Sequence, residues 1–216
     1  MPENSTRTVQ RALALLAAVC ERGDASLAEA SRDCDLSSST AFRLMRTLES
    51  SGFLARSSDH TFRPGPWLIR LGAQAFSQDM LVPLSRGPME SVVEATGESV
   101  CLSVPGVGDT AMYVAIVEGT YSVRHTNWVG RTIPLKGSAA GEVLRGGIPE
   151  AGYVVLENTV EEDVTAICAP VCVGGEVPAA MSTLVPSYRL DERRRQVCGA
   201  ALVAAASEVS QALGAE

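Results

Sequence analysis

Three apolar patterns of helical period lie within the first 52 residues, and their order constrains the fold more than any other feature. Residues 9–20 carry apolar side chains at i, i+3, i+4 and i+7 spacing, which predicts an amphipathic helix. Ser26 is a suitable N-cap for a short helix over residues 27–32. Residues 37–39 offer three N-caps for a longer helix that ends at Gly52. This order predicts a helix-turn-helix unit.

The third of these helices separates its residues by chemical type. One face is apolar and is expected to pack against the first two helices. The other face carries small hydroxyl side chains and arginines, as a DNA recognition helix does, because these groups donate hydrogen bonds to base edges and phosphates. An ordinary solvated helix is expected to show Glu–Lys pairs instead. We therefore predict DNA binding by Ser38, Ser39, Thr40, Arg43, Arg46 and Thr47.

A strand-like pattern follows this helix. Residues 53–56 and 61–63 flank a polar turn, which predicts a two-stranded hairpin that forms a wing. Arg56 and Arg63 lie on the two sides of its tip, and we predict that both contribute to DNA binding.

Charge is divided unevenly along the chain, whose net charge is −7. Residues 1–75 carry nine arginines and eight acidic residues, whereas residues 76–216 carry nine basic and seventeen acidic residues. A near-neutral, arginine-bearing head is compatible with DNA binding by one small domain. The acidic body is expected to repel DNA.

The later patterns predict a second domain of mixed helices and strands. We expect a DNA-binding domain at residues 1–65, a linker helix at 66–82 and a further domain at 83–216. In that domain we expect helices at residues 84–96, 137–146 and 190–213, and strands at 99–104, 111–117, 121–125, 153–156, 164–173 and 177–184.

The six cysteines include no Cys-x-x-Cys pair. Cys20, Cys101 and Cys198 fall on expected apolar faces, where free cysteine behaves as a small hydrophobic residue. Cys168 and Cys172 are four apart, so on a strand they share one face but are too distant for an easy disulfide. We interpret all of them as reduced structural thiols.

Metal, catalytic and membrane roles find little support. The chain has two histidines, so neither a zinc site of ordinary spacing nor another metal or cofactor is expected. No Gly-x-Ser-x-Gly motif occurs, and we predict that the protein is not an enzyme. The apolar runs are shorter than a bilayer span and no export signal is evident, so a cytoplasmic protein without a membrane segment is expected.

The order and spacing of the motifs resemble the IclR-type bacterial transcriptional regulators over nearly the whole chain. The resemblance rests on residues 11–13, 26–29, 36–48, 52–54, 62–65, 96–98, 129–135, 138–141, 169–171 and 182–186. It implies an α+β fold, with an N-terminal winged helix-turn-helix followed by a GAF/PAS-like α/β effector-binding domain that has an antiparallel sheet. It also implies a homodimer or tetramer that binds double-stranded operator DNA and a small-molecule effector.

The same resemblance implies an effector site. The positions that match the ligand-contacting segments of the family are Ile133, Ala139, Ala140, Leu156, Ala166, Ser182 and Leu184. All but Ser182 are apolar and would leave a carboxylate poorly paired, so we predict an apolar or amphipathic effector. Two departures from the family bear on this site. Glu142 replaces the usual lysine, and the segment at residues 145–152 is shorter, which leaves one wall open or rebuilt.

Some features keep two interpretations. Residues 137–141 are either a tightly packed helix start or a set of backbone amides that face a ligand. Arg124, His125 and Trp128 line either the pocket or an interface, and residues 193–195 are interpreted as a solvated helix face. We predict a ligand-responsive DNA-binding transcriptional regulator, expected to be a repressor. The alternative is a small-molecule sensor or scaffold module that has lost DNA binding.

Overall fold

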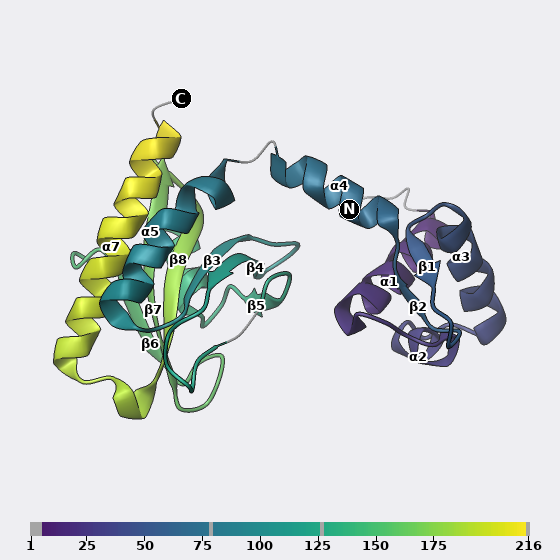
Figure 1. The fold of residues 1–216 in the computed structure, drawn as a ribbon, viewed down its shortest axis with the longest axis horizontal. Coiled ribbons are helices and arrows are strands. Elements are labelled where there is room, and N and C mark those ends of the chain that lie inside the picture. The colour runs from purple at the N-terminus through teal and green to yellow at the C-terminus, as the bar shows by residue number, and fades with distance from the viewer. Residues whose placement is uncertain (1–5, 78–79, 126–127, 215–216) are drawn as a thin grey trace. The chain divides into compact units, whose positions relative to one another are not determined.

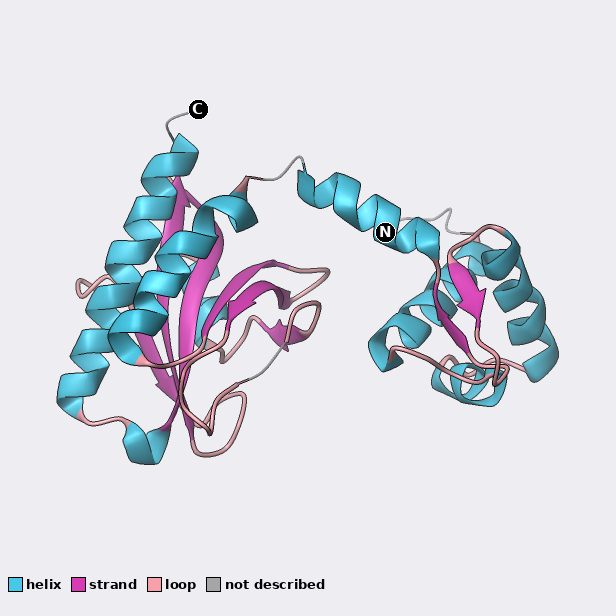
Figure 2. Cartoon of the chain, viewed as in Figure 1, coloured by secondary structure: helices cyan, strands magenta, loops and turns pink. Residues whose placement is uncertain are grey.

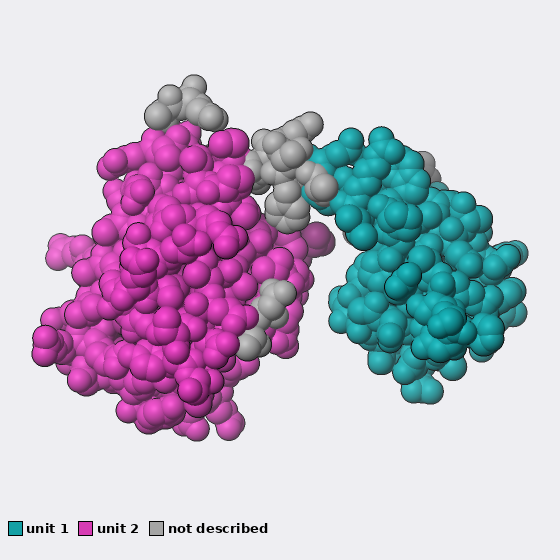
Figure 3. Space-filling view, viewed as in Figure 1, with its two compact units in different colours: residues 1–78 teal, residues 79–216 magenta. Residues whose placement is uncertain are grey.

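The structure is a computed structural model that describes residues 6–77, 80–125 and 128–214. Figure 3 shows its two compact units, residues 1–78 and residues 79–216. Figure 1 labels the elements along the chain, and Figure 2 separates helices from strands. The α+β class and the winged helix-turn-helix followed by an antiparallel-sheet domain are confirmed.

The first unit is a helix-turn-helix with a short hairpin. Its elements are α1 (Arg7–Arg22), α2 (Leu27–Asp33), α3 (Ser38–Ser50), β1 (Leu54–Arg56), β2 (Phe62–Pro64) and α4 (Pro66–Ser77). Leu15, Met45 and Phe62 are among the fully buried side chains that join α1, α3 and the hairpin into one core. Backbone hydrogen bonds between Ala25 and Phe62 (2.9 and 2.8 Å) attach the hairpin to the loop before α2.

Local sequence explains where these helices begin. The Ser26 hydroxyl accepts a bond from the Glu29 amide while the Glu29 carboxylate accepts one from the Ser26 amide, which is a complete capping box. The Ser37 hydroxyl caps α3 by accepting from the Thr40 amide at 3.4 Å. Gly65 precedes α4, and a side chain there would collide with the Gly52 carbonyl, so the chain can turn closely only with glycine.

The second unit is a six-stranded antiparallel sheet with helices on both faces. The strand order is β5-β4-β3-β8-β7-β6. Its elements are α5 (Leu81–Thr96), β3 (Val100–Pro105), β4 (Thr110–Val117), β5 (Thr132–Pro134), α6 (Ala139–Leu144), β6 (Val154–Glu157), β7 (Val164–Val173), β8 (Glu176–Pro186), the short 3-10 helix η1 (Ser187–Arg189) and α7 (Glu192–Gly214).

Alternation along the strands divides the buried residues of this unit between two cores. Leu102, Ile167 and Met181 belong to the core under α5 and α7. Cys101 and Ala166, each one residue removed along its strand, belong to the other core, which α6 covers. By length and composition α7 is the one helix of the described residues that could span a membrane, but one side of it is buried in the first of these cores.

Two strand expectations for this unit differ from the structure. The expected strand over residues 121–125 is wrong, because the chain bends there and its groups bond to arginines instead of a neighbouring strand. The Tyr121 hydroxyl accepts from Arg194 at 2.8 Å, and the Val123 carbonyl accepts from Arg189 at 3.1 Å. Strand β5 was not expected, since its three residues are too few to show an alternating pattern.

One cysteine expectation is also wrong. Cys20 is exposed, because α1 turns Leu15, Leu16 and Val19 toward the core. Cys172 is exposed whereas Cys168 is buried, and the register of β7 with β8 is irregular between residues 171 and 173. The expected burial of Cys101 and Cys198 is confirmed.

Candidate functional site

The exposed face of α3 presents the polar residues predicted to bind DNA. Ser38, Ser39, Arg43, Arg46 and Thr47 are exposed and Thr40 is half-buried. The opposite side of the helix is buried through Ala41, Leu44 and Met45. The structure therefore brings six of the eight predicted residues onto one helix face.

The two arginines of α3 differ in their partners. The Arg46 guanidinium donates to the Glu49 carboxylate at 2.9 Å, so part of its charge is already neutralised. The Arg43 side chain makes no hydrogen bond or ion pair in the described part of the chain. Thr47 donates its hydroxyl to the Arg43 carbonyl at 3.1 Å, within the same helix. Arg43 is consequently the freest cation on this face.

The hairpin carries the other two predicted residues. Arg56 and Arg63 are both exposed and lie on adjacent strands, where Arg63 pairs in register with Ala55. The Arg56 guanidinium lies 5.5 Å from the centre of the Phe62 ring, a cation–π contact that orients it. Both arginines are thus available beside the turn that joins β1 to β2.

In the second unit, the seven residues expected to bind an effector gather on the α6 side of the sheet. Ile133, Ala139, Ala140, Leu156, Ala166 and Leu184 belong to the core there. Ser182 lies on the same side, in register with Cys101 of β3 and Cys168 of β7. Its hydroxyl makes no hydrogen bond within the described residues.

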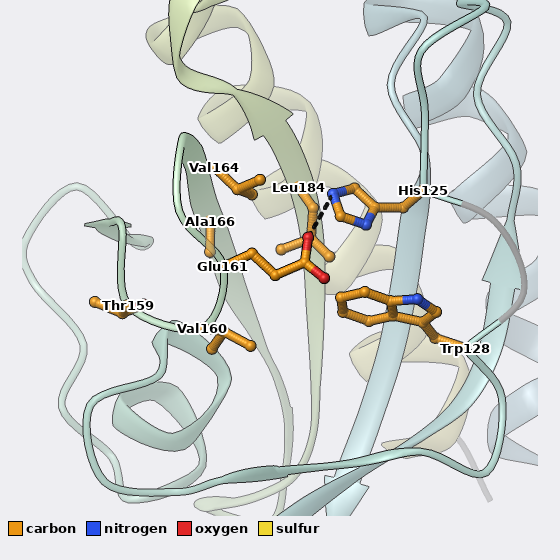
Figure 4. Close-up of a pocket in the computed structure, with 8 residues that line it drawn as sticks. All are labelled: His125, Trp128, Thr159, Val160, Glu161, Val164, Ala166 and Leu184. Carbon is orange, nitrogen blue, oxygen red and sulfur yellow. Dashed lines mark ion pairs between the residues drawn. The ribbon is translucent and has the colours of Figure 1, made fainter.

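A small pocket opens on this side of the sheet (Figure 4). It has room for about one water molecule between its walls. His125 and Trp128 form one wall, so the interpretation of these two as pocket residues agrees with the structure. The full lining is His125, Trp128, Thr159, Val160, Glu161, Val164, Ala166 and Leu184.

Sequence reasoning found only part of this lining. Ala166 and Leu184 are the two members of the expected set that reach the pocket, whereas Ile133, Ala139 and Ala140 lie elsewhere in the same core. The loop residues Thr159, Val160 and Glu161 were missed. They belong to a polar connection between β6 and β7 that has no periodic pattern to mark it.

The pocket is apolar with one acidic and one imidazole group at its edge. The His125 Nε2 atom lies 3.9 Å from a Glu161 carboxylate oxygen, and the His125 ring meets Trp128 edge-on with 4.9 Å between ring centres. Burial lowers the pKa of His125, and the Glu161 carboxylate opposes that shift in part. No lysine or arginine lines the pocket, so nothing there would neutralise an anionic ligand.

Side chains fix the segment that carries His125. The Ser99 hydroxyl donates to the His125 carbonyl at 2.8 Å and accepts from the Gly119 amide at 2.9 Å. Glu98, the residue before Ser99, is buried, and its carboxylate accepts two hydrogen bonds from the Arg189 guanidinium, at 2.9 and 2.8 Å. The Arg189 guanidinium also lies 4.1 Å from the centre of the Tyr121 ring.

This cluster corrects the interpretation of residues 193–195 as a solvated face. Arg194 donates to the Tyr121 hydroxyl and lies 3.6 Å from Glu98. Arg195 pairs with Glu157 at 2.8 Å, and only Arg193 of the three is exposed. The sequence gives no sign of this, because the acidic partners lie far away along the chain.

The start of α6 is tightly packed. The Ser138 hydroxyl accepts from the Gly141 amide at 3.1 Å and donates to the Pro134 carbonyl. A side chain at Gly141 would collide with the backbone of Leu135. These contacts agree with the packed interpretation of residues 137–141, because one of the amides is already bonded within the helix start.

Sequence comparisons agree with the two-unit architecture. Residues 8–58 match the family described as the IclR helix-turn-helix domain, and residues 73–151 match the C-terminal domain of the bacterial transcriptional regulator IclR. The chain is similar to the HTH-type transcriptional regulator KdgR of Escherichia coli (strain K12), with 24% identity over 98% of this chain and 94% of that protein. It is also similar to the HTH-type transcriptional repressor AllR of Salmonella typhimurium (strain LT2), with 27% identity over 98% of this chain and 92% of the relative.

Solved structures share the fold. One is an IclR homolog from Microbacterium hydrocarbonoxydans complexed with 4-hydroxybenzoate. It aligns with a TM-score of 0.78 and 22% identity, over 97% of this chain and 100% of that one.

Proposed function

The chain belongs to the IclR family of bacterial transcriptional regulators, and from this premise we propose how its two units divide the work. The protein is a DNA-binding transcriptional regulator with a C-terminal effector-binding domain, and it is not an enzyme. We propose that α3 and the hairpin bind operator DNA and that the pocket on the α6 side of the sheet takes the effector. As a regulator of transcription it would act in the cytoplasm, without membrane attachment.

The polar, exposed face of α3 carries the DNA-binding proposal. A recognition helix lies in the major groove with its N-terminal residues against base edges. Ser38 and Ser39 are exposed at that end, and Arg43 follows one turn later without an internal partner. We assign base contacts to these residues with Thr40, Arg46 and Thr47, and phosphate contacts to Arg56 and Arg63.

Footprinting of the purified full-length protein on the intergenic DNA beside its gene tests this proposal. Protection of a two-fold symmetric site is the expected result, and loss of protection in an Arg43→Ala variant that folds normally would locate the contact on α3. Absence of protection on that DNA and on a random DNA pool would favour the sensor or scaffold alternative.

We propose that the protein binds DNA as a homodimer. One α3 reads one half-site, so specific binding by this small unit needs a second copy. Exposed apolar side chains in the first unit support this: Val9 and Leu13 on α1 are 54% and 58% exposed, and Ile69 on α4 is 71% exposed. Burying these side chains against the same surface of a second copy would stabilise an isologous dimer.

Light scattering on the wild type and on a Leu13→Asp variant tests the dimer. The wild type should have the mass of a dimer, and the variant should dissociate because the carboxylate would be desolvated in the interface. A wild-type tetramer that dissociates to dimers would indicate an additional interface. A monomer at micromolar concentration that binds tightly to one half-site would contradict the proposal.

We propose an apolar or amphipathic effector. Val160, Val164, Ala166 and Leu184 supply apolar walls. An apolar ring that widens this pocket would gain about 25 cal/mol per Å² of apolar surface that it buries. Glu161 would repel a carboxylate, and His125 is held neutral by burial. The 4-hydroxybenzoate complex of the Microbacterium homolog supports an aromatic ring as the ligand core for this fold, whereas the carboxylate of that ligand would have no cationic partner in this pocket. Here we expect a neutral aromatic or lactone-like compound.

A thermal-shift screen distinguishes the ligand classes. Neutral aromatic compounds should raise the melting temperature of the wild type, whereas glyoxylate and pyruvate should not. Stabilisation by such oxo-acids, without a response to aromatic or lactone-like compounds, would contradict the proposed chemistry. Because AllR is named a repressor, we propose that this protein also represses and that the effector releases it from DNA.

A further inference from the structure

Residues 118–125 lead from β4 to the pocket and form neither helix nor strand. The last of them is His125, which forms one wall of the pocket together with Trp128 (Figure 4). A segment of this kind lacks the hydrogen-bond ladder of a helix or strand, so bonds to other parts of the chain fix its course. Those bonds therefore determine where the imidazole of His125 lies.

One buried hydroxyl joins the two ends of this segment. The Ser99 side chain, directly before β3, accepts from the Gly119 amide at 2.9 Å and donates to the His125 carbonyl at 2.8 Å. Ser99 is 1% exposed, so this bridge is shielded from water. Ser99 is itself attached to β8, because the Thr183 hydroxyl donates to its carbonyl at 2.9 Å. The segment is thus tied to the sheet at both ends through one side chain.

Close backbone packing holds the first end without help from a side chain. The Thr120 amide donates to the Gly97 carbonyl at 2.9 Å. A Cβ atom at Gly119 would lie 2.5 Å from that same carbonyl oxygen and 2.6 Å from the Ser99 amide nitrogen, so this approach requires glycine. Loss of the Ser99 hydroxyl would consequently release the other end, at His125, more than the end at Gly119.

The opposite wall of the pocket is held by different contacts. The loop that carries Glu161 ends at Asp163, whose carbonyl accepts from the Ser187 amide of η1 at 2.7 Å. The Asn158 side chain accepts from the Asp163 amide at 2.8 Å and closes the base of this loop. None of these bonds involves Ser99. A change at Ser99 would therefore move the His125 wall relative to the Glu161 loop.

We propose that Ser99 is a positioning residue of the pocket, which sets the distance between the His125 wall and the Glu161 loop and so the size of ligand that fits. This inference rests on the proposed effector pocket. The His125 Nε2 atom lies 3.9 Å from Glu161, and the His125 and Trp128 ring centres are 4.9 Å apart. The pocket has room for about one water molecule, so a small displacement of this wall changes a large part of its space.

The pKa of His125 is a readout that loss of stability alone does not move. Burial lowers this pKa in the wild type. Release of the His125 backbone should let solvent reach the imidazole, so that its pKa rises toward the ordinary value of about 6.5. NMR titration of Ser99→Ala should show this rise, in a His60→Gln background that leaves His125 as the one histidine. An unchanged pKa in folded Ser99→Ala would overturn the proposal.

Thr183→Val is the matched control for stability. It also removes a buried hydroxyl that bonds to Ser99, but at the Ser99 carbonyl. Thr183 is in register with Val100 and Ile167, which belong to the core on the other side of the sheet. The melting temperature should fall as in Ser99→Ala, while the pKa of His125 should stay at its wild-type value. An equal rise of this pKa in Thr183→Val would indicate general loosening and overturn the proposal.

Two further substitutions of Ser99 grade the effect. Ser99→Thr keeps the hydroxyl and should keep the wild-type pKa of His125. Ser99→Cys has a weaker hydrogen-bonding group and should raise this pKa less than Ser99→Ala does. If Ser99→Ala does not fold, the measurement on Ser99→Cys decides, and a wild-type pKa of His125 in that variant would overturn the proposal.

Ligand size gives a second readout, with phenol and 2-naphthol as neutral aromatic probes of one and two rings. In Ser99→Ala the rise in melting temperature caused by 2-naphthol should increase relative to that caused by phenol, whereas Thr183→Val should keep the wild-type ratio. The wild-type ratio in Ser99→Ala would overturn the assignment of ligand size to Ser99. If the wild type responds to neither probe, the proposed effector chemistry fails, and the titration still decides whether Ser99 positions His125.

Discussion

Arginine is paired with an acidic side chain more often in the second unit than in the first, where Arg22 pairs with Asp33 and Arg46 with Glu49. In residues 79–216 most arginines are held by acidic side chains, at Arg86–Glu90, Arg124–Glu118, Arg145–Asp109, Arg189–Glu98, Arg194–Glu98 and Arg195–Glu157. In residues 1–78 the exposed arginines Arg43 and Arg63 have no such partner among the described residues. The acidic unit uses its cations to hold itself together, and the near-neutral unit leaves cations unpaired on the surface that we assign to DNA.

This difference predicts whether the loss of a given arginine pair or arginine lowers the stability of the protein or its affinity for DNA. A cation paired with a buried carboxylate contributes to folding, because removal of one partner leaves the other desolvated. An exposed, unpaired cation contributes little to folding and remains free for a phosphate or a guanine. The following substitutions test whether stability and DNA affinity separate in this way.

Glu98→Gln should have the largest effect. The Glu98 carboxylate is 1% exposed and bonds to two atoms of Arg189, so its removal is expected to lower the free energy of unfolding by about 3 kcal/mol. Glu157→Gln is the matched control, because its pair with Arg195 is at the surface and should contribute less than about 1 kcal/mol. Chemical denaturation of the three proteins measures the difference. Equal stability of the two variants would show that the buried Glu98–Arg189 pair contributes no more to folding than the surface Glu157–Arg195 pair.

Arg43→Ala should lower the affinity for operator DNA and leave stability nearly unchanged. If Arg43 contacts guanine, its loss should cost about 1–3 kcal/mol of operator binding and relax one base position, while stability changes by less than about 0.5 kcal/mol. Arg46→Ala should cost less, because Arg46 must first leave Glu49. Arg193→Ala, an exposed arginine of the other unit, is the control. Fluorescence anisotropy at several salt concentrations checks this, and unchanged binding by the Arg43→Ala, Arg46→Ala double variant would contradict it.

Ala166→Phe should block the effector without changing DNA binding. Ala166 lies against the pocket, and a phenyl ring at this position would occupy the space between its walls. The expected result is loss of ligand-induced stabilisation, with operator affinity within about two-fold of the wild type. Ala204→Phe, on the exposed side of α7, should retain the ligand response. A full response in Ala166→Phe would place the ligand elsewhere in the unit.

The two units also differ in how far the sequence predicts them. In the first unit the helix ends depend on local signals, such as the Ser26–Glu29 capping box and the Ser37 cap, so the fold and the exposed face of α3 follow from the sequence. Cys20 shows the limit, because periodicity does not say which of two adjacent stripes of α1 is buried.

In the second unit the decisive contacts are distant along the chain. Glu98 meets Arg189, and the loop at Glu161 meets His125, only after the sheet has formed. Neither contact leaves a periodic signal. The side of the sheet that holds the site could be predicted from the resemblance, but the pocket itself depends on that loop.

The smallest effect concerns pH and involves His125. Because burial lowers its pKa in the folded state, the unfolded chain takes up a proton more readily as the pH falls. The stabilising contribution of the neutral imidazole is therefore complete above the ordinary histidine range, about pH 6.5, and is lost as the pH falls below it. Wild-type protein should lose more stability than His125→Gln between pH 7.5 and pH 5.

Glu161→Gln sharpens this test, because the Glu161 carboxylate opposes the lowering of the pKa of His125. Without that carboxylate the imidazole should be harder to protonate in the folded state, and stability should fall more steeply with acid than in the wild type. Denaturation midpoints at a series of pH values measure both slopes. An unchanged or shallower slope for Glu161→Gln would contradict an interaction between this carboxylate and His125 in the pocket wall.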